Sequence, residues 1–95
     1  MQNELNKWLE RAQTIVDAQY GTSLSRPTLF LKRGKKYIKV VAEDQGGSRY
    51  VFCFVDESGN ILKGASWNKP AKGVRGNIFE QGKEGVSAYG ALYLR

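Results

Sequence analysis

The first twenty residues carry apolar side chains at the spacing of one face of a helix. These positions are Leu5, Trp8, Leu9, Ala12, Ile15 and Val16, with Tyr20 able to extend the stripe. Because polar residues take the positions between them, the pattern predicts an amphipathic helix over about residues 3 to 19. Gly21 is suited to end it, and we expect Trp8 to lie in the core.

Beyond residue 27 the pattern changes to short runs of β-branched and aromatic residues. The runs are "TLFL", "KYIKVVAE", "SRYVFCFVD" and "NILKGASW", and the turn-forming stretches "KRGKK" and "DESGN" join them into two hairpins. Four consecutive strands predict an antiparallel meander with the helix packed on one face. The expected fold class is therefore α+β, with a sheet of four or five strands in one domain over residues 1–95.

The run "RYVFCFV" is apolar on both sides of its predicted pleat and is expected to be a central strand. Strict alternation places Tyr50, Phe52 and Phe54 on one face and Val51, Cys53 and Val55 on the other. The helix can cover only one face. Either the C-terminal segment covers the second face, or some of these aromatic side chains stay exposed and bind a partner.

Regular alternation fades after Asn68, which predicts an irregular basic segment. Pro70 cannot donate to a sheet ladder, so we expect it to break the strand that ends at Trp67. Glycines around Arg75 indicate a tight basic turn whose N–H groups could converge on an anion, the alternative being a loop with a solvated arginine. The last eight residues, "AYGALYLR", are expected to form a closing strand.

Charge is unevenly distributed along the chain. Fifteen Lys and Arg stand against nine Asp and Glu, which gives a net charge of +6. Nine of these cations lie in two stretches without an acid, and they are Lys32, Arg33, Lys35, Lys36 and Lys39, then Lys63, Lys69, Lys72 and Arg75. Clustered positive charge is typical of proteins that bind phosphate, although it can also serve solubility alone.

Residue types needed for most catalytic sites are missing. The chain has no histidine and one cysteine, which excludes Ser-His-Asp and Cys-His centres and the usual zinc sites. No P-loop or G-x-G-x-x-G motif occurs. Three pairs of acids remain, at predicted strand ends or in a glycine-rich loop where acids are common, and they are Glu43 with Asp44, Asp56 with Glu57, and Glu80 with Glu84. We expect no enzymatic activity, cofactor or metal.

Cys53 is expected to be a buried strand thiol, which fits a reducing compartment. No signal peptide pattern and no apolar run long enough to span a membrane is present, so a cytoplasmic protein is expected.

Aromatic rings beside cations favour binding of a polyanion. Trp67 lies between Lys63 and Lys69, and Tyr37 between Lys36 and Lys39. Either ring could stack on a base while the cations hold the backbone. The alternative, which we favour for Trp67, is a core plug whose indole N–H meets a carbonyl.

The run "LKGASWNKPAKGVRGNIF", followed by "AYGALYLR", resembles the C-terminal half of small tailed-bacteriophage proteins that share an ASW-x-x-PAK-x-x-RGNIF core and a YG-x-x-YLR ending. A looser likeness extends upstream through the helix, "GKKYIKV" and "FVD…GNILK". The resemblance implies a phage origin and action in the cytoplasm of an infected bacterium. It transfers no catalytic residue, and the positions that match its motif are Trp67, Pro70, Lys72, Arg75, Gly76 and Asn77.

We therefore predict a non-enzymatic protein that binds single-stranded DNA or RNA with little sequence specificity. The predicted contacts are Lys35, Lys36, Lys39, Lys69, Lys72, Arg75 and Asn77, with stacking by Trp67 or Tyr37. A second hypothesis is a phage effector that binds a host protein, and a third is a small metal-dependent nuclease. A free sheet edge could also support a homodimer.

Overall fold

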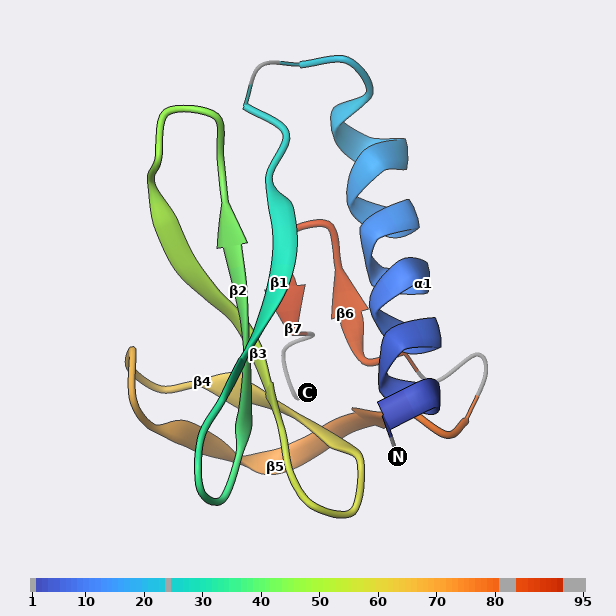
Figure 1. Cartoon of the computed structure of the whole chain (residues 1–95), viewed down its shortest axis with the longest axis vertical. Coiled ribbons are helices and arrows are strands. Elements are labelled where there is room, and N and C mark those ends of the chain that lie inside the picture. The colour runs from blue at the N-terminus through green and yellow to red at the C-terminus, as the bar shows by residue number, and fades with distance from the viewer. Residues whose placement is uncertain (1, 24, 81–83, 92–95) are drawn as a thin grey trace.

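The computed structural model describes residues 2–23, 25–80 and 84–91 (Figure 1). One helix packs against a five-stranded sheet, and a short hairpin follows the sheet. The elements are α1 (Gln2–Tyr20), β1 (Thr28–Arg33), β2 (Ile38–Glu43), β3 (Arg49–Val55), β4 (Asn60–Gly64), β5 (Pro70–Asn77), β6 (Val86–Ser87) and β7 (Gly90–Ala91).

Helix α1 confirms the predicted amphipathic helix. Its buried positions are Leu5, Trp8, Ala12 and Val16. The helix ends where Gly21, at φ +59°, donates its N–H to the Asp17 carbonyl over 2.8 Å. Trp8 is fully buried, as expected, and its indole N–H donates to the Glu84 carbonyl at 3.0 Å. The helix therefore packs on the sheet and is also hydrogen-bonded to the segment that follows β5.

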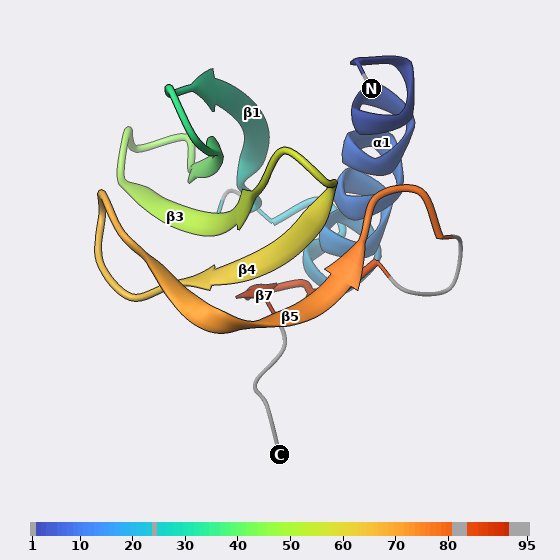
Figure 2. The same cartoon turned by 90° about the horizontal axis from the view of Figure 1, so that it is seen from below.

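The sheet is the predicted antiparallel meander, with strand order β1-β2-β3-β4-β5. It bends strongly across its width, so that β1 stands apart from the plane of β4 and β5 (Figure 2). The β1–β2 turn is closed by the Gly34 N–H, which donates to the Tyr37 carbonyl at 2.9 Å. The β3–β4 turn is an Asx turn, in which one carboxylate oxygen of Asp56 accepts the Ser58 and Asn60 N–H groups. The α+β expectation is confirmed.

The prediction of an irregular segment after Asn68 was wrong. Strand β4 ends at Gly64 rather than at Trp67, and Pro70–Asn77 forms β5 along β4. Pro70 is the first residue of its strand, opposite Gly64, and a first position tolerates proline because its missing N–H does not interrupt the ladder. The β4–β5 pairing contains two register shifts, which accommodate the absence of apolar–polar alternation along β5.

Strict alternation in β3 was also wrong, because a bulge interrupts it. Val40 pairs with Cys53 and Val41 with Val51, so Phe52 is an extra residue between them. Phe52 and Cys53 both join the core that faces the helix, and Phe54 faces the opposite side of the sheet, directly across from Lys39. Cys53 is fully buried as predicted, and burial raises its pKa.

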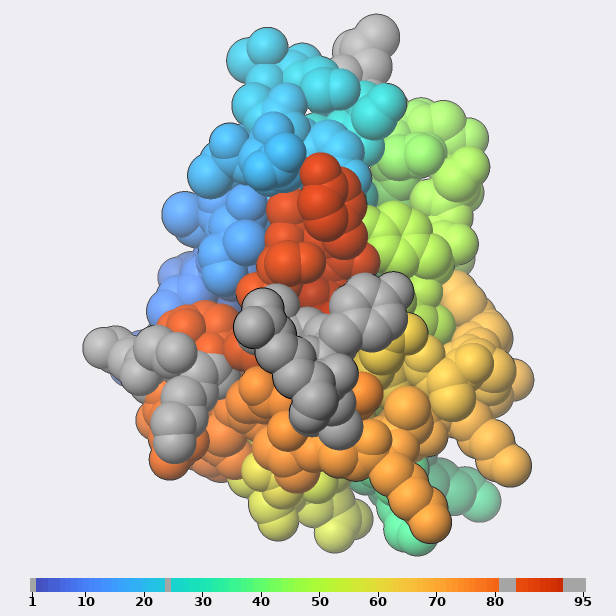
Figure 3. All heavy atoms as spheres, turned by 180° about the vertical axis from the view of Figure 1, so that it is seen from behind, coloured from blue at the N-terminus to red at the C-terminus, as the bar shows by residue number. Residues whose placement is uncertain are grey.

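The hairpin β6–β7 completes the core on the same side as the helix. Val86 and Ala91 lie in the core cluster, and from behind the hairpin fills the space between α1 and β3 (Figure 3). The described part of the C-terminal segment, residues 84–91, therefore does not cover the opposite face of the sheet. Of the closing strand predicted over residues 88–95, the structure shows Gly90–Ala91, and residues 92–95 lie outside the described residues.

Gln13 joins the helix to the start of β1. Its side-chain oxygen accepts the Leu29 N–H at 2.8 Å, and its nitrogen donates to the Pro27 carbonyl at 3.1 Å. We expect Gln13→Ala to lower the free energy of unfolding by about 1–2 kcal/mol, because it leaves two partly buried main-chain groups without a partner. Urea denaturation measures this, with Gln19→Ala on the exposed side of the same helix as control. Equal effects of the two substitutions would contradict the assignment.

Candidate nucleic-acid interface

The turn between β1 and β2 forms one wall of a hollow of about 240 Å³, named here the cationic hollow. The lining combines five cations with two aromatic rings and an amide, and no carboxylate of the described residues takes part in it. Its residues are Lys32, Arg33, Gly34, Lys35, Lys36, Tyr37, Lys39, Phe54 and Asn68. The first acid-free stretch of the sequence thus forms one site together with a residue from the second.

Lys39 is the unusual member of this set. Its side chain points away from the helix, opposite Lys32 on β1 and Phe54 on β3, yet only 9% of the residue is exposed. The ammonium lies 4.1 Å from the centre of the Trp67 ring, and Nζ donates to Asn68 Oδ1 at 3.3 Å. Within the described part of the chain no carboxylate pairs with Lys39. Burial, and then the charge of Lys32, lower the pKa of Lys39.

Trp67 is not the core plug that we favoured from the sequence. It lies in the loop 65–69 between β4 and β5, and 40% of it is exposed. Two N–H groups, those of Ala65 and Ser66, donate to the Lys69 carbonyl at 2.8 and 3.1 Å and fold the loop back on itself. The ring lies over Lys39, so the two basic stretches meet at this contact. Figure 1 shows the two turns that carry them, at the bottom and at the left.

Tyr37 lines the hollow but is half-buried. Its ring packs edge-on against Phe54, with 6.1 Å between centroids. Lys35 and Lys36 are exposed at the tip of the turn, and none of the ion pairs among the described residues involves them. These two cations are therefore free to meet an anion, whereas Tyr37 mainly supports the floor.

The remaining predicted contacts lie elsewhere. Lys69 is exposed in the loop beside Trp67, and Lys72 is exposed on β5. Arg75 lies towards the far end of β5, where it helps to line a separate polar hollow of about 510 Å³ with Asn77 and Phe79. Arg75 donates to the Gly73 carbonyl at 3.2 Å. The tight basic turn predicted around Arg75 was wrong, because residues 70–77 are a strand.

Asn77 has an evident structural role. Its side-chain nitrogen donates to Asn60 Oδ1 at 2.9 Å, and its oxygen accepts the Phe79 N–H at 2.9 Å. Asn60 pairs with Asn77 at one end of the β4–β5 ladder, whereas Gly64 and Pro70 pair at the other end, next to Trp67. The predicted contact residues are thus divided between the two ends of this ladder.

Sequence reasoning missed three polar members of the hollow as contact candidates, which are Lys32, Arg33 and Asn68. A signal for Lys32 was available, because a hairpin centred on residues 34–37 places Lys32 opposite Lys39. Asn68 carries no such signal, since its place depends on how the loop 65–69 folds.

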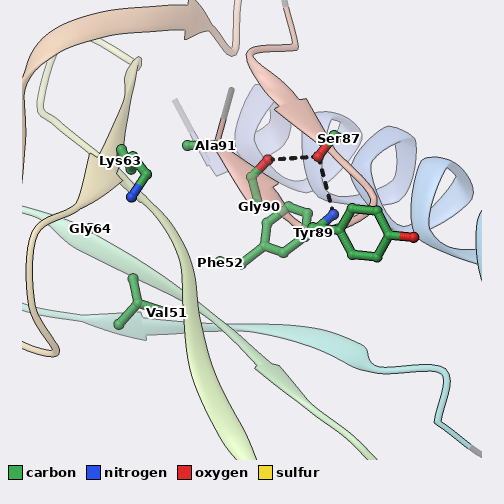
Figure 4. Close-up of a pocket in the computed structure, with 8 residues that line it drawn as sticks. All are labelled: Val51, Phe52, Lys63, Gly64, Ser87, Tyr89, Gly90 and Ala91. Carbon is green, nitrogen blue, oxygen red and sulfur yellow. Dashed lines mark hydrogen bonds between the residues drawn. The ribbon is translucent and has the colours of Figure 1, made fainter. Parts of the chain in front are cut away.

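A third hollow, of about 230 Å³, lies among β3, β4 and the hairpin (Figure 4). Its lining includes Val51, Phe52 and Tyr89. The Ser87 hydroxyl there donates to the Gly90 carbonyl and accepts the Tyr89 N–H, so it serves the hairpin turn. This hollow lacks the cluster of cations that distinguishes the cationic hollow.

Comparison with known protein families identifies a match for this chain. A family model described as "Family of unknown function (DUF7717)" matches residues 1–90. The chain belongs to this family. No curated protein and no solved structure matches it. Membership in DUF7717 comes without an activity, so the function has to be argued from the site.

Two absences hold for the part of the chain that the structure describes. No helix there is long and apolar enough to cross a membrane. The same residues contain no group of three or more His, Cys, Asp or Glu side chains that could hold a metal ion.

Proposed function

We propose that this protein binds single-stranded DNA or RNA, with little sequence specificity and without catalysis, through the cationic hollow and Trp67. The observation that carries the proposal is Lys39, a lysine only 9% exposed that has no carboxylate partner in the described chain and lies in a hollow with four other cations. A buried charge is normally paired, because desolvation is costly. An incoming phosphate would supply the missing negative charge.

The arrangement around Lys39 is unfavourable in the free protein. Lys32 and Lys39 lie directly opposite each other on neighbouring strands, and like charges in that position destabilise a sheet. Lys35 and Lys36 add two cations at the tip of the same turn. Phosphate oxygens accept hydrogen bonds from all of these groups and reduce their mutual repulsion. Binding therefore relieves an energetic penalty that the fold alone does not explain.

Trp67 supplies the second half of the proposed mechanism. One face of the ring meets Lys39, and 40% of the residue is open to solvent. A base of a single strand can stack on the open part, which is worth about 1–3 kcal/mol, and stacking is tolerant of sequence. A duplex offers no unpaired base to this ring, so single strands are preferred.

The likeness to tailed-phage proteins supports the place of action. Trp67 and Lys72 belong to the shared motif, and Lys69 lies between them. We infer that the protein is phage-encoded and works in the cytoplasm of the infected bacterium, with Lys69 and Lys72 guiding the strand away from the hollow.

Fluorescence anisotropy with a labelled 15-nucleotide strand tests the proposal. If about four cations contact phosphates, log K falls with log salt at a slope of about −3. Single strands of different composition should bind similarly, and duplex more weakly. Absence of binding even at low salt would overturn the proposal.

Trp67→Ala should weaken binding of that strand by at least about fivefold, because stacking is lost. Trp67→Phe should retain part of the affinity. Tyr89→Ala is the matched control, because Tyr89 is an exposed aromatic outside the cationic hollow. Equal losses in the alanine variants of Trp67 and Tyr89 would show that Trp67 has no special role.

A second candidate function is the binding of an acidic host protein. It is favoured by two exposed apolar side chains near Arg75, since Val74 is 51% and Phe79 50% exposed. Exposed aromatic and arginine side chains are typical of interaction hot spots. Pull-down from host lysate, with and without nuclease, tests it. This function would be favoured over the first if one host protein is still captured after nuclease treatment and is no longer captured by the Phe79→Ala variant.

A further inference from the structure

We propose that the cationic hollow receives the terminal phosphate monoester of a strand, in preference to a phosphodiester within the strand. This inference rests on the proposed function and names the group that the same site selects. Three features of the hollow carry it: the largely buried Lys39, the donor-only character of the charged side chains around it, and the position of Trp67.

Lys39 lines the hollow, and only 9% of the residue is exposed. Its ammonium has three N–H donors. One meets Asn68 Oδ1 and the ammonium also faces the Trp67 ring, and no other acceptor contacts Nζ in the described residues. At least one donor is therefore left for a ligand. We infer that a group binding to this donor enters the hollow.

A phosphate monoester can enter in this way and an internal phosphodiester cannot do so easily. The diester carries a sugar on each side and presents two free oxygens, so it lies along a surface. The monoester is linked on one side only and presents three free oxygens, with a charge of about −1.5 to −2 at pH 7. It can approach Lys39 end-on while its remaining oxygens face Lys35 and Lys36.

The other charged side chains of the hollow are also donors only. Lysine and arginine carry no acceptor. The ammonium of Lys39 can only donate, so it fixes the orientation of the Asn68 amide, with Oδ1 towards Nζ. The amide nitrogen of Asn68 is then left to donate to a ligand. Such a lining matches the acceptor-only oxygens of a phosphate.

The position of Trp67 extends the site by one residue of the ligand. Because the ring lies over Lys39, a phosphate bound to Lys39 places the base of the same nucleotide close to the open part of Trp67. The end of a strand would thus be held at two points, by its phosphate in the hollow and by its first base on the ring. An internal nucleotide makes the first of these contacts less readily, because its phosphate carries a sugar on each side.

Anisotropy on 15-nucleotide strands tests this inference. One pair of strands carries its label at the 3′ end and either a phosphate or a hydroxyl at the 5′ end, and a second pair has the opposite arrangement. For at least one end we expect the strand with the phosphate to bind about fivefold tighter or more than the strand with the hydroxyl. The phosphate adds a negative charge that accepts charge-assisted hydrogen bonds from the cations of the hollow. A nucleoside monophosphate should compete better than the corresponding nucleoside, and inorganic phosphate should compete measurably.

The exposed variant Lys36→Gln should reduce the preference for the phosphorylated end without affecting folding, and Lys39→Met should remove it. Lys72→Gln, outside the hollow, should weaken both strands of a pair equally and keep the preference. Equal binding of phosphorylated and unphosphorylated ends would overturn the inference and leave the proposed function standing. Failure of every strand to bind at low salt would overturn both.

Discussion

Lys39→Met is expected to weaken strand binding by at least about tenfold and, at the same time, to make the protein more stable. The loss of binding follows because the Trp67 ring and Asn68 hold the ammonium of this largely buried residue in place at the site. A hydrogen bond to a charged group is worth about 1.5–3 kcal/mol. Anisotropy measures the loss, with Lys7→Met on the exposed side of α1 as the matched control.

The gain in stability has a separate cause. Replacing an incompletely paired buried charge by an apolar side chain of similar length is often stabilising, and we expect about 1 kcal/mol, or a rise of several degrees in Tm. Since the pKa of Lys39 is lowered in the folded protein, the penalty for its charge is complete at pH values below that pKa, shrinks as the pH rises above it, and is gone above the pKa of the unfolded chain. The advantage of Lys39→Met over the wild type should therefore shrink in alkaline solution.

Thermal melting at neutral and alkaline pH measures this difference. A Lys39→Met protein that melts below the wild type and binds strands as well as it does would show that Lys39 serves the fold alone. A stabilising substitution that removes binding is instead the pattern expected of a residue kept for function.

Trp8→Ala is expected to have the largest effect on folding, lowering the free energy of unfolding by about 3–5 kcal/mol. The side chain is fully buried, and its removal leaves a cavity between α1 and the sheet. It also removes the donor to the Glu84 carbonyl. Because domains of this size have a total stability of about 5–15 kcal/mol, much of the variant could be unfolded at 37 °C.

Chemical denaturation measures the effect of Trp8→Ala, and Trp67→Ala is its control. Both remove a tryptophan, but Trp67 is 40% exposed and lies in a loop, so its loss should change the free energy of unfolding by less than about 1 kcal/mol. Similar destabilisation by the two substitutions would contradict the assignment of one tryptophan to the core and the other to the surface.

Helix α1 and the first four strands could be predicted because their apolar residues follow the periods of a helix and of a pleated strand. Strand β5 could not, because Pro70, Gly73 and Gly76 leave its sequence without alternation, and its register is shifted by bulges. The bulge at Phe52 was hidden for the same reason. A bulge is decided by how two strands fit together, and no single run of residues reports it.

The charged residues of the site could be predicted from the sequence, but the burial of Lys39 could not. The sequence identifies the cations of the β1–β2 hairpin. It also shows that Trp67 lies between Lys63 and Lys69 along the chain. It does not show that the loop 65–69 folds back over β2, because this depends on tertiary contacts between Lys39, Trp67 and Asn68. That contact changes Trp67 from an expected core residue into a surface residue, and it makes Lys39 the centre of the site.

Tryptophan fluorescence during titration with a single strand tests the central claim most directly. Trp8 is fully buried and Trp67 is 40% exposed, so a soluble quencher such as acrylamide selects the emission of Trp67. If a base stacks on this ring while phosphates occupy the cationic hollow, the strand should quench Trp67 to saturation, protect it from acrylamide and lose both effects at high salt. Binding of the strand by anisotropy with unchanged Trp67 emission and accessibility would place the interface elsewhere and contradict the account.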